Sequence, residues 1–143
     1  MYLIGEVLRR LTASALNELF VKHTESLPRN QLSLMNDGVL LGAYVTAHYL
    51  ELGKSVAALD MTNTFNSLPR KCLHESTKQT ILENYVTWRY GTYSDLILSE
   101  ELQIQSQSGV QQGDPLNMTL FCVAISRPIS NVQLLHPDVC IIV

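Results

Sequence analysis

The sequence has few cysteines, few charged residues and no long apolar run. Its three cysteines, Cys72, Cys122 and Cys140, lie far apart, without the close spacing of a zinc site, and an odd number cannot pair completely into a disulfide framework. The start, MYLIGEVLRR, lacks the pattern of a signal peptide. We therefore expect reduced thiols and a protein of the cytoplasm or nucleus that is not secreted.

The charge balance is slightly acidic. The 143 residues carry 10 basic and 13 acidic side chains, for a formal net charge of −3. This argues against a free-standing domain that holds nucleic acid by electrostatics alone, and it leaves open basic surfaces elsewhere in a longer chain. Because no apolar run approaches the length of a membrane span, we expect no membrane partner. The apolar fraction of 46% is typical of a folded globular protein.

Apolar periodicity and turn residues predict a mixture of helices and short strands. Helices are predicted over about 5–22, 37–52, 76–90 and 114–129. Strands are predicted over 55–59, 96–98, 102–104 and from about 139 to 143. The strands 96–98 and 102–104 are predicted to form a hairpin. The order indicates an α+β or mixed α/β fold, with a small mixed or antiparallel sheet packed against helices.

The first predicted helix has an apolar face and a basic side. Its apolar residues recur at three- and four-residue spacing and predict the buried face: Val7, Leu8, Leu11, Ala15, Leu16, Leu19 and Phe20. Arg9 and Arg10 are predicted on the exposed side.

The stretch SVAALDMTNTFNS, Ser55 to Ser67, places Asp60 directly after a run of small and apolar residues. That run predicts a buried strand. A carboxylate at the carboxyl end of such a strand lies where α/β proteins place their chemistry, and it is a hard oxygen ligand suited to Mg²⁺. The alternative is that Asp60 only caps the turn that follows.

The most specific stretch is the loop GVQQGDPL, Gly109 to Leu116. Its two glycines permit tight turns and close approach of a ligand, and its two glutamines offer both donors and acceptors. A well-capped connection from a hairpin to a helix is the alternative. It accounts for the Gly-Asp-Pro part of the loop but not for the glutamines.

Together these stretches resemble a known family. SVAALDMTNTFNS resembles motif A of reverse transcriptases and SGVQQGDPL resembles their motif B, most closely in the non-LTR (LINE-like) retrotransposons, where a Leu-Phe pair like Leu120–Phe121 follows. IGEVLRRL, Ile4 to Leu11, is similar to the fingers stretch ahead of their palm, and YVTWRYGT, Tyr85 to Thr92, lies where they carry a comparable helix end.

The resemblance implies a partial reverse transcriptase domain over residues 1–143, with fingers-to-palm helices in 1–54 and a partial palm in 55–143. It implies an RNA-directed DNA polymerase that adds deoxynucleotides to a primer by two-metal phosphoryl transfer. The implied cofactor is Mg²⁺, and the implied partners are an RNA template, a DNA primer and a dNTP.

The resemblance also assigns roles to individual residues. Asp60 matches the catalytic metal ligand of motif A, and the backbone carbonyl of Met61 would be a second ligand. Phe65 matches the aromatic residue that packs under the incoming sugar and excludes a 2′-hydroxyl. The alternative is that Phe65 is simply a core aromatic. Gln112 and Gly113 match the motif B pair that lies against the incoming nucleotide and template.

Arg9 and Arg10 follow the position of the family's phosphate-binding fingers arginine. They are either contacts to a nucleic-acid backbone or a solvated helix face.

The sequence departs from the family at several positions. Thr64 replaces a small residue, Asn117 and Met118 replace Gly-Pro, and the aromatic-x-Asp-Asp of motif C, expected after a strand like VCIIV, is missing. Because Mg²⁺ dehydrates reluctantly, one carboxylate cannot hold two such ions, and we expect an incomplete, inactive site.

Two other readings remain. One is a non-catalytic retroelement relic or gene-model fragment. The other is a haloacid-dehalogenase-like phosphatase, which needs a second Asp where Thr62 stands. The oligomeric state is left open.

Overall fold

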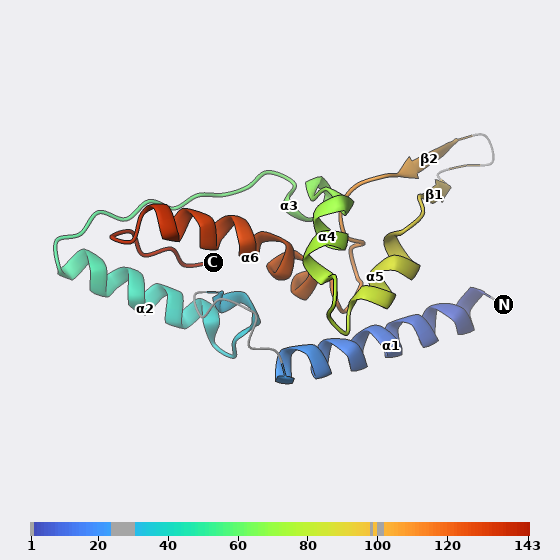
Figure 1. Cartoon of the computed structure of the whole chain (residues 1–143), viewed down its shortest axis with the longest axis horizontal. Helices are drawn as coiled ribbons and strands as arrows, with labels where there is room; N and C mark the ends of the chain where they lie inside the picture. The colour runs from blue at the N-terminus through green and yellow to red at the C-terminus, as the bar shows by residue number, and fades with distance from the viewer. Residues whose placement is uncertain (1, 24–30, 98, 100–101) are drawn as a thin grey trace.

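The computed structural model describes residues 2–23, 31–97, 99 and 102–143. Most of them are helical, and the rest include one small antiparallel sheet, so the predicted α+β class is confirmed at that coarse level (Figure 1). The elements in chain order are α1 (Tyr2–His23), η1 (Leu32–Leu34), α2 (Gly38–Glu51), α3 (Thr64–Ser67), α4 (Arg70–Thr77), α5 (Glu83–Tyr90), β1 (Ser94–Ile97), β2 (Gln103–Ser106) and α6 (Asn117–Leu135).

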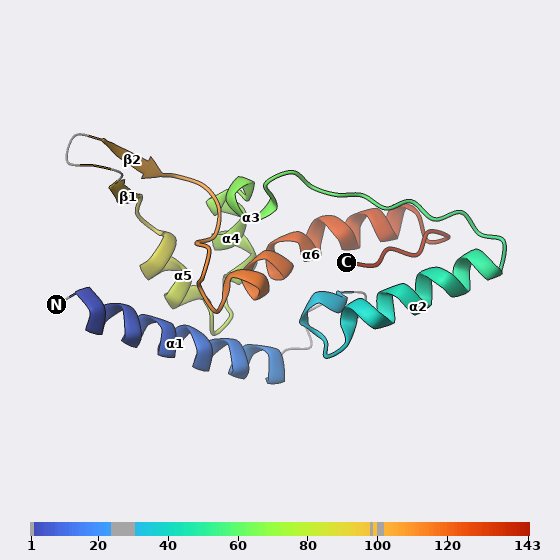
Figure 2. The ribbon, with the colours of Figure 1, turned by 180° about the vertical axis from the view of Figure 1, so that it is seen from behind.

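The helix α6 lies at the centre of the molecule. It packs against α4, which in turn packs against α5, while α2 packs on η1 toward the other end (Figure 1). Seen from behind, α1 lies below α5 (Figure 2). The chain between α2 and α3 runs along α6 and is not helical. The core between these helices consists mainly of aliphatic residues, with Leu73, Leu82, Val86, Leu116 and Leu120 fully buried.

The helix α6 also has the length and mean hydropathy of a membrane span. A core helix of a soluble protein passes the same test. Of this span only about a third, from Thr119 to Ala124, is buried in the protein.

The predicted hairpin is confirmed. β1 and β2 pair antiparallel, with Ser94 opposite Ser106 and Ile97 opposite Gln103. Part of its connection, residues 98 and 100–101, lies outside the described residues.

Two predicted strands are wrong. Residues 55–59 are extended but exposed, and 139–143 form no strand; the described residues contain one sheet only, made of β1 and β2. Leu59 is 93% exposed, and the carbonyl of Val143 accepts a hydrogen bond from the amide of Leu32 at 2.6 Å. An apolar run becomes a strand only where a neighbouring strand satisfies its backbone groups, and neither run has one among the described residues. Asp60 therefore does not end a strand.

The buried face of α1 also differs from the prediction. Arg9, Ala13 and Phe20 are buried, whereas Val7, Leu8 and Leu11 are 52%, 59% and 62% exposed. The spacing of four residues from Arg9 to Ala13 and of seven residues from Ala13 to Phe20 is still helical. The helix is rotated because Arg9 points inward, to a buried acid described below.

Candidate functional site

The two motif-like stretches meet at α3. The amide of Gly109 donates to the carbonyl of Leu68 at 2.8 Å, and the amide of Val110 donates to the carbonyl of Phe65 at 2.9 Å. The hydroxyl of Ser108 donates to the carbonyl of Asn66, 42 positions away in sequence, at 2.9 Å. The start of the GVQQGDPL loop is thus fixed to the turn that carries Phe65.

Glycine is required at this contact. Gly109 has a φ of +76°, and a Cβ there would lie 2.5 Å from Cα of Asn66 and 2.6 Å from the carbonyl oxygen of Phe65. Gly113 has a similar φ of +80°, but a Cβ there would meet nothing within 4 Å. Close backbone approach therefore demands glycine at the first position, and conformation alone favours it at the second.

Phe65 is half-buried. Its ring packs edge-to-face against Phe121, with 5.3 Å between the ring centroids and 61° between the planes. Gln112 and Gly113 are exposed. The loop and the aromatic residue therefore come together through the backbone, and the ring of Phe65 touches the core from the same turn.

Asp60 lies in the exposed segment that leads to α3, as does Met61, which is 56% exposed. Across the described residues, Asp60 has neither a hydrogen-bond nor an ion-pair partner, and no group of three or more His, Cys, Asp or Glu side chains could hold a metal ion. The residues that the structure describes thus do not form the two-metal site that the resemblance implies.

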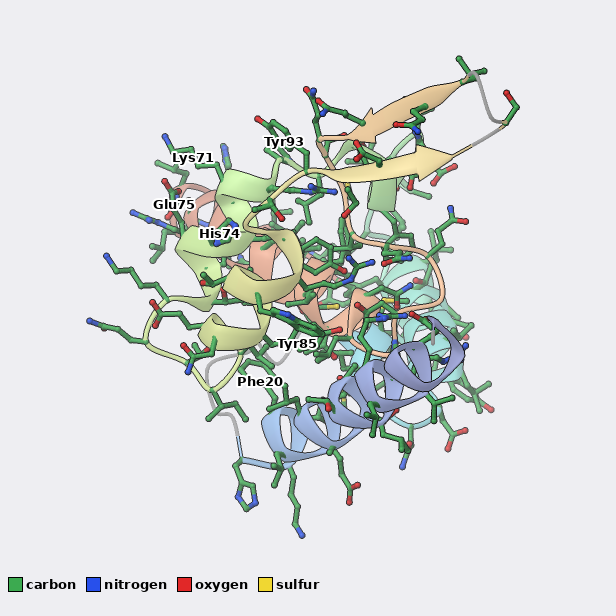
Figure 3. The ribbon with its side chains drawn as sticks, turned by 90° about the vertical axis from the view of Figure 1, so that its right-hand side faces the viewer. Phe20, Lys71, His74, Glu75, Tyr85 and Tyr93 are labelled. Atoms are coloured by element: carbon green, nitrogen blue, oxygen red, sulfur yellow. The ribbon has the colours of Figure 1, made fainter. Side chains whose placement is uncertain are left out.

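A different acid, Asp114, is buried and forms several hydrogen bonds. Its side chain is fully buried, and its Oδ2 accepts hydrogen bonds from Tyr85 Oη at 2.8 Å, Tyr90 Oη at 3.2 Å and Arg9 Nη1 at 3.2 Å. Its Oδ1 accepts the amide of Leu116 at 3.0 Å, just before α6 begins. Figure 3 shows Tyr85 between α5 and α1, where it reaches this carboxylate.

Arg9 was predicted on an exposed face, and that prediction is wrong. Its side chain is 9% exposed, and its guanidinium group binds the carboxylates of Glu6 and Asp114 within the protein. The hydrogen bond from Arg9 lowers the pKa of Glu6 below its usual value and raises the pKa of Arg9 itself. Arg10 is exposed, as predicted.

Burial is the main cause of the raised pKa values of the two tyrosines that bind Asp114. The pKa of Tyr90 is raised to about 12, mainly by burial and also by the neighbouring Asp114, while the hydrogen bond from the Gln111 amide lowers it. The pKa of Tyr85 is also raised, first by burial and then by its hydrogen bond to Asp114. Both hydroxyls therefore stay protonated and keep donating to the carboxylate well above neutral pH.

Two cavities lie elsewhere. One of about 580 Å³ is lined by residues of α1, α4 and α6, among them Phe20, Cys72 and Arg127. Another of about 660 Å³ lies between α1, η1 and the start of α6, near Asn17 and Met118. Neither is lined by a residue to which the sequence assigned a role.

Comparison of the chain with protein-family models, with curated proteins and with solved structures gave no match.

The two loop glycines provide a matched pair of variants. We expect Gly113→Ala to lower the free energy of unfolding by about 1 kcal/mol, through backbone strain alone. Gly109→Ala adds a clash with the backbone of α3 and should cost about 2 kcal/mol more. Urea denaturation followed by circular dichroism measures both; equal losses would contradict the close contact between the loop and α3.

The tyrosine network predicts alkaline sensitivity. Because the pKa of Tyr90 is about 12 in the folded protein and about 10 in the unfolded chain, the unfolded state loses this proton first as the pH rises. Stability from Tyr90 is complete below about pH 10 and is lost between about pH 10 and 12. Denaturation midpoints measured from pH 8 to 12 should fall less steeply in Tyr90→Phe than in the wild type. Tyr93→Phe, which alters an exposed ring, is the control and should keep the wild-type profile.

Proposed function

We propose that the chain is part of the fingers-to-palm region of an RNA-directed DNA polymerase of the non-LTR retrotransposon type. In the intact enzyme it would help to hold an RNA template, a DNA primer and a dNTP. The alternative is a relic of such an element without biochemical activity.

The observation that carries the proposal is the junction of the two motif-like stretches. Motifs A and B of a polymerase must lie together, because the sugar and base of one nucleotide are held between them. The hydrogen bonds from Gly109 and Val110 to the α3 turn bring these stretches together, although a hairpin and two helices separate them in sequence. A plain connection from a hairpin to a helix would not require this contact.

Within this proposal each side chain has a limited task. Phe65, supported by Phe121, offers a rigid ring against which a 2′-hydroxyl would clash. Gln112 and Gly113 are exposed on the loop, between the residues that bind it to the rest of the protein. The amide side chain of Gln112 and the backbone of Gly113 would contact a base pair. Mg²⁺ would supply charge stabilisation in the intact enzyme. The described residues contain no group of ligands that fits two such ions.

The first test is catalytic. On a primed RNA template with Mg²⁺ or Mn²⁺, we expect no primer extension by the 143-residue chain above a no-protein control. The reason is that, within the described part of the chain, Asp60 belongs to no group of three or more side chains that could hold a metal ion. Extension that depends on Asp60 would contradict the view of an incomplete site.

The second test separates the polymerase fragment from the relic. We expect a primed template with the matching dNTP to shift the backbone amide signals of Phe65, Gln112 and Gly113 in a nitrogen-15 NMR titration. In the proposed function these residues would contact the nucleotide. The amides of Val39 and Tyr44 on α2, at the other end of the molecule, serve as an internal control.

The variant Gln112→Ala should weaken this binding, because it removes an exposed amide without touching the core. Asn131→Ala, at an exposed position on α6, is the matched control and should bind as the wild type does. Absence of shifts at the loop, with the protein folded, would favour the relic.

A further inference from the structure

Two arginines pack against the ring of Tyr90. The guanidinium carbon of Arg70 lies 5.7 Å from the ring centroid, and that of Arg89 lies 5.8 Å from it. Stacking on an aromatic face holds a guanidinium in a fixed plane and leaves its edges free for hydrogen bonds. Tyr90 is itself immobilised by Asp114 and by the Gln111 amide at its hydroxyl, so both cations are held on a rigid support.

Both arginines have unused donors. The Nε of Arg70 and the Nε of Arg89 are buried and have no hydrogen-bond partner, which is costly for a charged group. Arg70 uses its other nitrogens to bind the carbonyl of Thr92 at 3.3 Å and the hydroxyl of Ser106 at 2.9 Å. For Arg89, the described part of the chain provides no hydrogen-bond partner at all.

Within the described residues neither arginine forms an ion pair, although the charge of Arg89 acts on the carboxylate of Glu6. The carboxylates of Glu6 and Asp114 bind Arg9, and that of Glu75 binds Lys71 at 3.7 Å. Burial is the main cause that lowers the pKa of Arg70, and the charge of Arg89 lowers it further.

The face that carries α4 has side chains of both charges. Figure 3 shows Lys71, Glu75 and His74 on α4, with Tyr93 on the same side of the molecule. Tyr93 is 62% exposed, and its electrostatic interaction with Arg70 raises the pKa of the arginine. A tetrahedral anion has enough oxygens for the free edges of two guanidinium groups, whereas a carboxylate has only two.

We propose that Arg70 and Arg89, stacked on the ring of Tyr90, form a binding site for a phosphate group. The phosphate belongs either to the phosphodiester backbone of a nucleic-acid strand or to a small phosphate compound. The site uses no residue of the two motif-like stretches, so it does not rest on the function proposed above.

The test observes the arginines directly. In a nitrogen-15-labelled protein, sodium phosphate should shift the Nε–H signals of Arg70 and Arg89 in a saturable way. The exposed Arg10 and Arg127 serve as internal controls and should not respond. Sodium chloride at equal ionic strength should have no such effect. Equal responses of all four arginines, or none, would overturn the proposal.

A second titration uses a ten-residue oligothymidylate. Saturation of the same two signals at lower concentration than with inorganic phosphate would identify a phosphodiester as the ligand. A response to inorganic phosphate alone would identify a small phosphate compound.

Substitution provides an independent check. Arg89→Gln removes one cation that makes no hydrogen bond within the described residues, so the fold should persist, as circular dichroism would verify. We expect phosphate binding about tenfold weaker in this variant, from the loss of charge-assisted hydrogen bonds. Lys54→Gln removes the same charge at the far end of α2 and should bind as the wild type does. Unchanged binding by a folded Arg89→Gln would exclude the site.

Discussion

The buried carboxylate of Asp114 determines how the helices are placed. A carboxylate without partners in the protein interior would be too costly to keep. Here, four donors surround it: Arg9 from α1, Tyr85 and Tyr90 from α5, and the amide of Leu116 at the start of α6. Each donor must reach the same group, so the rotation of α1 and the position of α5 against α6 are set by one side chain.

The same network fixes the loop that precedes Asp114. The hydroxyl of Tyr90 donates to Asp114 and accepts the amide of Gln111 at 3.2 Å, while Gly109 and Val110 are bound to the turn at α3. The loop is therefore held on both sides of its exposed tip. A tip held in this way presents its groups without first losing conformational freedom, which favours recognition of a ligand.

Much of the fold could be predicted from the sequence because helices and hairpins depend on local contacts. α1, α2 and the hairpin follow directly from periodicity and turn residues. The run 55–59 was misjudged because strand formation depends on a partner that local sequence does not specify. The inward position of Arg9 depends on Asp114, 105 positions away, and periodicity ranks an arginine as exposed. The sequence leaves two roles open for Phe65, since an aromatic residue on a turn can contact a nucleotide or pack into a core.

The extended segment between α2 and α3 has a consequence for the integrity of the chain. Residues 54–61 are exposed and extended, and exposed segments of this kind are preferred sites of proteolytic cleavage. A cut here would leave two pieces that remain joined by Arg9 with Asp114, and by Gln31 with the carbonyl of Cys122 at 2.7 Å. The molecule thus has the architecture of two interlocking halves, α1–α2 and α3–α6, that could assemble from separate polypeptides.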